Sequence, residues 1–283
     1  MSVKIVTDSI SDLPAEIVKA LDITVIPMMV NFGEETYRDG LDLSPEQFYE
    51  RLKTSTVFPH TTVPSIHLFS DTFDKLAKEN EEILVITVSS RLAASYNEST
   101  QAIRFMKRKC RVEVIDSHWA GMAEGFVVMA AARAALAGAG LDEAKEVTQK
   151  TMSRVEFHAT FDTLEYLGRG GRIGHAWAML GSLLKVNPVI TLKNGVVEPV
   201  SKARSRAKAI DQLYQFAESC SNIEQMAVED AASPKEADAL VKRLGALFPE
   251  EKILRSKAAP TVGAHTGPSL LLVSIQGKLH SRA

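Results

Sequence analysis

The chain has 283 residues, of which 45% are hydrophobic and 24% are charged, as is typical of a soluble globular protein with one large or two smaller domains. The formal net charge of −2 gives no electrostatic reason to expect nucleic acid or an acidic membrane as a partner. The two cysteines have no metal-ligand spacing, no apolar run reaches about 18 residues, and no signal-peptide core stands at the N-terminus. We therefore expect a cytoplasmic protein without disulfides, bound metal or membrane insertion.

In the first half of the chain, short β-branched runs alternate with helical patterns. We predict strands over residues 4–7, 23–30, 83–88 and 112–115. We predict helices over residues 14–21, 45–53, 66–78, 93–107, 120–137 and 141–154. Helix-start signals support this assignment: residues 44–47 (SPEQ) form a capping box with a first-turn proline, Ser65 can cap the next helix, and Ser11 and Asp12 precede the helix at Pro14.

The second half is richer in strand patterns. Strand-like runs lie at residues 157–161, 189–192, 196–200, 226–228, 252–254 and 270–275, and Asn194-Gly195 indicates a hairpin. The alternation predicts an α/β fold with mostly parallel sheets, in which a ligand binds beyond the carboxyl ends of the strands. We place a domain boundary near residue 153, which gives α/β domains of residues 1–153 and 154–283.

The first half contains three polar clusters, and two of them directly follow predicted strands. They are residues 7–14 (TDSISDLP), 60–65 (HTTVPS) and 89–96 (SSRLAASY). Hydroxyl groups and the free N–H groups of a helix start suit a carboxylate or phosphate oxygen. Plain turns with helix caps contain the same residue types, so the residues alone leave both interpretations open.

Two clusters of the second half bring arginine and histidine. Residues 164–174 hold four glycines and two arginines, without the spacing of a dinucleotide or P-loop motif. An arginine held there can bind a carboxylate or phosphate through paired charge-assisted hydrogen bonds, and a solvated surface turn is the alternative. Residues 262–268 (VGAHTGP) place His265 in a predicted loop before the last strand. Together the clusters indicate the polar pole of one binding site.

The order of these motifs is distinctive. They stand at residues 7–14, 61–65, 89–96, 116–117, 170–173 and 265–267. In this order, over essentially the full length, the chain resembles the DegV family of bacterial fatty-acid-binding proteins. Six motifs in register are far more specific than any one of them.

The resemblance implies two α/β domains with a long acyl chain buried between or within them. It implies a lipid carrier without catalytic residues or a cofactor, whose bound fatty acid is phosphorylated by a separate kinase subunit that uses ATP. By the resemblance, Thr61 and a hydroxyl of the 89–96 turn hold the carboxylate. Arg172 and His265 belong to the polar surroundings, and Arg204 is suited to the kinase encounter or the phosphate.

The chain departs from the family pattern at Ala93, where the family has a serine that binds the carboxylate, and at Arg91, where it has a glycine. A missing hydrogen bond to a charged group costs roughly 1.5–3 kcal/mol of binding. Besides Arg91, the side chains that can compensate are Thr62, Ser90 and Ser95.

An acyl chain also needs an apolar wall. The apolar side chains of the second half that can line a tunnel, or simply fill the core, are Phe161, Trp177, Met179, Leu180, Leu183, Leu184 and Val186.

Two other functions stay open at this point. One is a small hydrolase or phosphotransferase that uses Asp8, Asp116 and His265 on an anionic substrate. The other is a lipid-sensing regulatory module.

Overall fold

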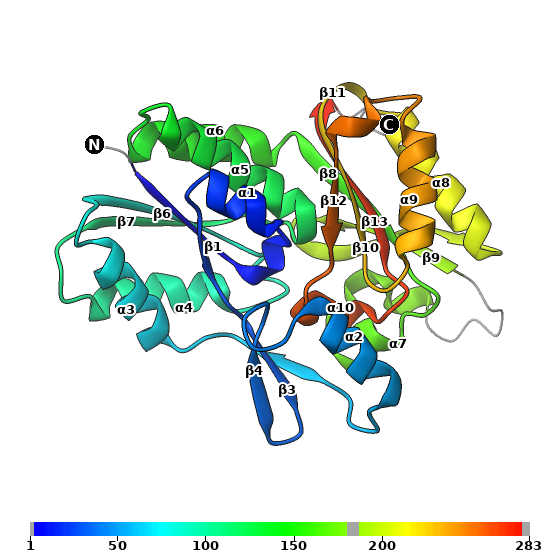
Figure 1. The fold of residues 1–283 in the computed structure, drawn as a ribbon, viewed down its shortest axis with the longest axis horizontal. Helices are drawn as coiled ribbons and strands as arrows, with labels where there is room; N and C mark the ends of the chain where they lie inside the picture. Colours follow the sequence, from blue (N-terminus) through cyan, green and yellow to red (C-terminus); the bar gives the residue numbers. More distant parts are fainter. Residues whose placement is uncertain (1–2, 180–186, 279–283) are drawn as a thin grey trace.

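The computed structural model describes residues 3–179 and 187–278 (Figure 1). These residues form a four-stranded, a three-stranded and a six-stranded β-sheet together with the helices that cover them. The α/β fold predicted from the sequence is confirmed. The helices of the first half are α1 (Ala15–Ala20), α2 (Pro45–Thr54), α3 (Ile66–Leu76), α4 (Ser95–Ala102), α5 (Gly121–Leu136) and α6 (Leu141–Met152).

The four-stranded sheet is parallel throughout. Its strands are, in spatial order, β2 (Thr24–Ile26), β1 (Lys4–Asp8), β6 (Glu82–Thr87) and β7 (Arg111–Asp116). On β6, Ile83 and Val85 pack into the cluster that contains α3, whereas Leu84 and Ile86 pack into the cluster that contains α5. Successive side chains of a strand point to opposite faces, so a continuous apolar run is needed where helices cover both faces.

The strand predicted over residues 23–30 is in fact two strands in different sheets. Strand β2 ends at Ile26, and the next strand begins only after Pro27, which lacks the N–H that a sheet ladder needs. The three-stranded antiparallel sheet that follows has the order β4 (Glu35–Arg38), β3 (Met29–Phe32) and β5 (His60–Thr62). Figure 1 shows β3 and β4 as a hairpin that projects at the bottom of the view.

The helix caps are confirmed in two cases and wrong in one. Ser44 forms the predicted capping box with Gln47, and the Ser65 side chain accepts a hydrogen bond from the Leu68 N–H. Helix α1 has no side-chain cap, because neither Ser11 nor Asp12 reaches its free N–H groups. The Asp12 backbone adopts the left-handed region with φ 48°, and its carboxylate binds a distant part of the chain instead.

The six-stranded sheet is mixed. Its spatial order is β10 (Val196–Ala203), β9 (Asn187–Lys193), β8 (Val155–Thr160), β13 (Leu271–Lys278), β11 (Ser221–Asp230) and β12 (Ile253–Lys257). Within this sheet, the β11–β12 pair is the only parallel one among the described strands, so the prediction of mostly parallel strands holds for the first sheet but not here. The predicted Asn194-Gly195 hairpin joins β9 to β10, with both residues at positive φ, and a turn this short requires antiparallel strands.

The remaining helices are α7 (Glu165–Arg169), α8 (Arg206–Glu218), α9 (Pro234–Leu244) and α10 (Pro260–Thr266). Helices α8 and α9 cover one face of the six-stranded sheet, as Figure 1 shows. On β13, Val273 and Ile275 pack against these helices, whereas Leu272 points to the opposite face. Helix α5 is buried along most of its length and contacts strands of both large sheets, so the two halves of the chain share one core.

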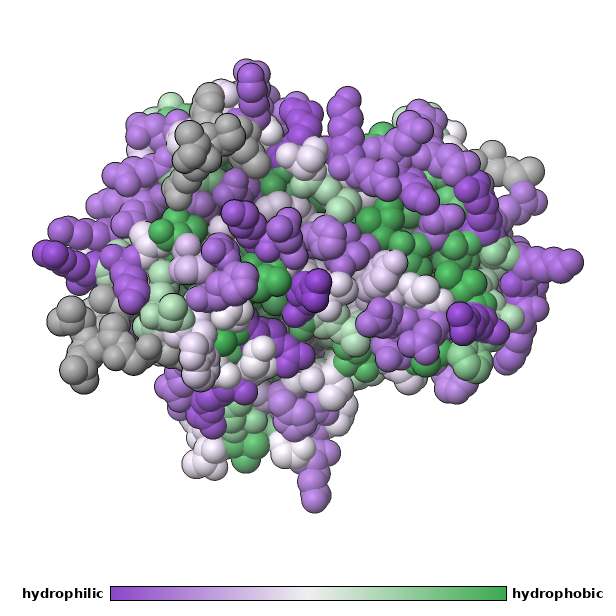
Figure 2. Space-filling view, turned by 180° about the vertical axis from the view of Figure 1, so that it is seen from behind, coloured by the Kyte–Doolittle hydropathy of each residue, from purple (hydrophilic) through white to green (hydrophobic). Residues whose placement is uncertain are grey.

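The surface is mostly polar. Hydrophilic side chains cover much of the face seen in Figure 2, with hydrophobic atoms visible between them. Among the helices of residues 3–179 and 187–278, none is long and apolar enough to span a bilayer.

Close packing of α10 against α2 generates a stability prediction. A Cβ atom at Gly263 would lie 2.6 Å from the Tyr49 hydroxyl and 2.7 Å from Phe48 Cε1. We expect Gly263→Ala to lower the free energy of unfolding by about 1–3 kcal/mol, as measured by urea denaturation. The control is Gly140→Ala, where the nearest atom to the new methyl is 3.5 Å away and the loss is smaller. Equal stability of the Gly263→Ala and native proteins would contradict this close packing.

Candidate functional site

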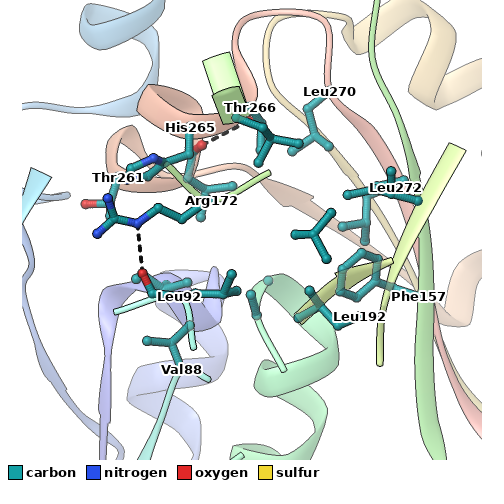
Figure 3. A pocket seen from close by; sticks show the side chains of 18 of the residues that line it. Val88, Leu92, Phe157, Arg172, Leu192, Thr261, His265, Thr266, Leu270 and Leu272 are labelled. Atoms are coloured by element: carbon teal, nitrogen blue, oxygen red, sulfur yellow. Dashed lines mark hydrogen bonds between the residues drawn. The ribbon is translucent and has the colours of Figure 1, made fainter. Parts of the chain in front are cut away.

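An apolar cavity lies between the six-stranded sheet, helix α10 and the loops that follow β1 and β6 (Figure 3). Its empty space, including the open mouth, is about 750 Å³. Representative wall residues are Val88, Leu92, Phe157, Leu192, Leu270 and Leu272. Both halves of the chain contribute, and the face of β13 opposite α8 and α9 supplies Leu272.

One side of the cavity is polar, and we call Thr61, Arg172 and His265 the head-group pole. Thr61 Oγ1 lies 2.8 Å from His265 Nε2, and this hydrogen bond joins strand β5 to helix α10. The Arg172 guanidinium donates from Nε to the Leu92 carbonyl at 3.0 Å and from Nη1 to the Gly170 carbonyl at 2.5 Å. Backbone carbonyls therefore hold the Arg172 cation beside His265 (Figure 3).

The imidazole of His265 is kept neutral. Burial, and then the positive charge of Arg172, lower the pKa of His265 to about 4. Its Nδ1 atom is buried and has no hydrogen-bond partner among the described residues. A side chain at Gly170 would overlap this ring, so glycine is needed there to let the α7 turn approach His265.

The segment that carries His265 is a helix, and the predicted loop over residues 262–268 is wrong. Helix α10 begins with Pro260 in its first turn and is followed by Gly267 at φ 75°. These are ordinary start and stop residues for a helix. On a helix, Thr261 and His265 are one turn apart and face the same cavity.

Two carboxylates from the first half hold the start of α10. The Ala259 N–H donates to Asp12 Oδ1 at 2.9 Å, and the Thr261 N–H donates to Asp39 Oδ2 at 3.4 Å. The Ser256 hydroxyl also donates to the Asp12 backbone carbonyl. These contacts are buried or partly buried, and they position α10 against the loop after β1.

Several buried acidic side chains surround the start of α10, and we did not predict this cluster from the sequence. Burial, and then the nearby Glu229 carboxyl, raise the pKa of Asp12 well above its usual value. Burial also raises the pKa of Glu229 and raises the pKa of Asp39 to about 6. Glu229 and Thr261 line the cavity as well. In the sequence, Glu229 is marked only as an acidic residue that directly follows the apolar run 226–228.

The structure brings together three of the predicted site residues, Thr61, Arg172 and His265, and Ala93 also lines the cavity. The remaining predicted site residues do not line it. They are Thr62, Ser90, Ser95 and Arg204.

These four side chains have other surroundings. Thr62 is exposed and accepts a hydrogen bond from Asn31. Ser95 is fully buried with its hydroxyl near the Met28 sulfur. Ser90 lies in the turn before α4, and Arg204 is exposed just before α8.

The carboxylates of the hydrolase alternative are engaged elsewhere. Asp8 accepts hydrogen bonds from the backbone N–H groups of Ile10 and Val88, and Asp116 accepts from those of Ser90 and His118. Neither carboxylate lines the cavity with His265. Within the described ranges, no group of three or more His, Cys, Asp or Glu side chains is placed to hold a metal ion.

The apolar residues predicted to line a tunnel have different environments. Phe161 lines the cavity, Met179 packs against the adjoining core, and Trp177 is 65% exposed. The other predicted lining residues lie outside the described residues: Leu180, Leu183, Leu184 and Val186.

Comparison with known families finds a match over nearly the whole chain. The family described as "Uncharacterised protein, DegV family" matches residues 2–278. The DegV domain-containing protein SCO2569 of Streptomyces coelicolor is 34% identical over 281 residues, which cover 98% of this chain and 99% of the relative. Protein DegV of Bacillus subtilis is 32% identical over 276 residues, covering 96% and 98% of the two chains.

Solved structures are similar over the same length. DegV from Bacillus subtilis, described as a fatty acid binding protein, has a TM-score of 0.90 and 29% identity, with 98% of this chain and 100% of that chain covered. A DegV family protein from Thermus thermophilus, described by its fatty acid binding, has a TM-score of 0.89 and 28% identity at the same coverage. A stearic acid-binding protein from Eubacterium ventriosum has a TM-score of 0.88 and 26% identity, covering 97% and 98%.

The lowered pKa of His265 can be tested by NMR. Burial and Arg172 both disfavour the imidazolium form, so we expect the ring proton resonances of His265 to keep their neutral positions from pH 8 to about 5. The spectrum of His265→Gln identifies the resonances. A titration midpoint above pH 6 would show that the ring is not desolvated in this way.

Proposed function

The chain belongs to the DegV family, and from this premise we propose that it binds a long-chain fatty acid in the cavity, with the carboxylate at the head-group pole. The observation that carries the proposal is a single apolar-walled cavity whose polar side presents Thr61, Arg172 and His265. Relatives described as fatty-acid-binding proteins support it, because they match this fold from end to end.

The apolar wall supplies most of the affinity. A long-chain fatty acid has about fifteen methylenes, and each contributes roughly 0.8 kcal/mol when it leaves water. Side chains such as Phe157, Leu192 and Leu272 offer the required surface, and the wall carries few polar atoms. The polar groups then decide which end of the ligand lies where.

The head-group pole suits a carboxylate. The Thr61 hydroxyl can accept a hydrogen bond from His265 Nε2–H and donate its own proton to a carboxylate oxygen. Arg172 supplies positive charge nearby and is held by two backbone carbonyls. In this arrangement His265 acts as a positioning residue that fixes the direction in which the Thr61 hydroxyl donates.

We further propose that the bound acid is a substrate for a separate kinase in the cytoplasm. A carboxylate oxygen of the ligand attacks the γ-phosphorus of ATP, an acyl phosphate forms, and ADP leaves. The chain sequence contains no P-loop motif for ATP, which is consistent with a carrier that depends on a partner. The exposed Arg204 is available for the kinase or the transferred phosphate.

The central test is the ligand that accompanies the purified protein. Native mass spectrometry and solvent extraction with gas chromatography should find a fatty acid at close to one per chain. The proposal is wrong if repeated preparations contain no acyl ligand and added palmitic acid does not bind. A protein that binds lipid but does not support acyl phosphate formation with any cognate kinase would instead be a lipid-sensing module.

Removal of the Thr61 hydroxyl tests the head-group pole. We expect Thr61→Ala to weaken palmitic acid binding by roughly tenfold to hundredfold, because one hydrogen bond to a charged group is lost. Isothermal titration measures the affinity. Thr61→Ser should restore much of it. The matched control is Thr62→Ala, which removes the neighbouring hydroxyl that lies outside the cavity, and equal effects of both alanine variants would count against the pole.

At Ala93 we expect a substitution to strengthen binding, in contrast to the loss expected at Thr61. Ala93 lines the cavity, and family resemblance places a carboxylate-binding serine there. We expect Ala93→Ser to tighten palmitic acid binding by about tenfold, because it adds a hydrogen bond to the carboxylate. Ala94→Ser is the control, because Ala94 is exposed and does not line the cavity. Unchanged affinity in Ala93→Ser would place the carboxylate elsewhere.

A further inference from the structure

Three more polar side chains line the same cavity outside the head-group pole: Glu229, Thr261 and Thr266, of which Thr266 already donates to the Val262 carbonyl. Glu229 comes from the end of strand β11, and Thr261 comes from the first turn of helix α10. Glu229 is 0% exposed and Thr261 is 1% exposed, so bulk water does not reach them. Buried polar groups need hydrogen-bond partners, and here they stand in an otherwise apolar wall.

Both side chains keep hydrogen-bonding capacity beyond the contacts that they make with the protein. Glu229 Oε2 accepts from the Met122 N–H at 3.0 Å, whereas Glu229 Oε1 and Thr261 Oγ1 have no hydrogen bond of ordinary geometry to a described residue. Each has a carboxyl as a side-chain partner: Asp12 is hydrogen-bonded to Glu229 and Asp39 to Thr261, both in a geometry looser than that of an ordinary hydrogen bond. A carboxylate oxygen accepts two hydrogen bonds and a hydroxyl both donates and accepts, so these neighbours leave capacity for a ligand.

The second polar point lies close to the head-group pole. Thr261 and His265 are four residues apart on α10, which puts them on one face and about 6 Å apart along the helix axis. Figure 3 shows Thr261, His265 and Arg172 on one side of the cavity, with Phe157 and Leu192 on the other. A ligand whose carboxylate is at the pole therefore passes Thr261 within its first few carbons.

The fold makes room for the Glu229 carboxylate at the wall. A Cβ atom at Gly121 would lie 2.9 Å from Glu229 Oε2, and Gly121 has a φ of 59°. Gly121 itself lines the cavity. The absence of a side chain at the start of α5 therefore lets the carboxylate occupy this position.

We propose that Glu229 and Thr261 form a second polar subsite, which binds a hydroxyl group carried by the acyl chain a few carbons from its carboxylate. The ligand class is then a long-chain 3-hydroxy fatty acid, in addition to the plain acid. The subsite rests on the proposed function, because the carboxylate must occupy the head-group pole. The ligand hydroxyl donates to Glu229 and exchanges a hydrogen bond with Thr261, whereas a wholly apolar wall would leave it unpaired.

Titration with three ligands tests the subsite in the full-length protein. The ligands are stearic acid, 3-hydroxystearic acid and 12-hydroxystearic acid. We expect the 3-hydroxy acid to bind at least as tightly as stearic acid, and the 12-hydroxy acid to bind about tenfold more weakly, because its hydroxyl meets only apolar wall. Tenfold weaker binding of the 3-hydroxy acid would overturn the subsite alone. Failure of stearic acid to bind would overturn the proposed function and the subsite with it.

Variants assign the preference to the two side chains. Thr261→Val keeps the shape and the backbone N–H, and we expect it to shift the affinity ratio of 3-hydroxystearic to stearic acid by about tenfold against the hydroxy acid. Thr261→Ser should restore the ratio. Thr266→Val is the matched control, because this cavity-lining hydroxyl already donates to the Val262 carbonyl, and it should leave the ratio unchanged.

A variant of Glu229 tests the proposal even if Thr261→Val does not fold. Glu229→Gln removes the anionic acceptor and keeps the size of the side chain, and we expect it to reduce the same ratio severalfold. Circular dichroism identifies variants that are folded. A ratio that stays constant in every folded variant of Thr261 and Glu229 would overturn the proposal.

Discussion

The hydrogen bond between the Ala259 N–H and the Asp12 carboxylate is the contact on which the site depends. It joins the turn after the first strand to the start of α10, 247 residues later, at 2.9 Å. The Ser256 hydroxyl binds the Asp12 carbonyl, so this tie is double. Because α10 carries Thr261 and His265, the tie sets where the polar side of the cavity stands relative to the first sheet. A partly buried hydrogen bond of this kind is stronger than one in water, because the local dielectric is lower.

The apolar side of the cavity follows from how the large sheets are covered. Helices α8 and α9 occupy one face of the six-stranded sheet, and the opposite face is left to the cavity and the core around Phe157 and Leu272. Helix α5 fills the space between the two large sheets. The cavity therefore lies in this shared interface, where helix α10 and side chains from both halves leave a gap.

Local pattern predicted most strands and helices, because apolar periodicity and helix caps are properties of neighbouring residues. The failures involve distant partners. Asp12 was expected to cap the next helix, yet its carboxylate binds Ala259. Glu229 had little local signal, because it matters only once β11 brings it to the cavity. Helix α10 was missed although Pro260 and Gly267 mark its ends, since seven residues give too short a periodic pattern. The residues of the head-group pole were predicted from the order of the six motifs along the chain, and not from the chemistry of any single motif.

The buried carboxyls described above also make folding a proton-uptake reaction. Asp8 and Asp39 have pKa values of about 6 in the folded chain against an ordinary value near 4, and burial raises those of Asp12 and Glu229 too. Between about pH 4 and 6 the folded state therefore holds more protons at these groups than the unfolded state, so their contribution to stability is greatest in acid and falls as pH rises. His265, with its lowered pKa, acts in the opposite direction. The same desolvation that surrounds the apolar cavity thus links the stability of the protein to the acidity of its surroundings.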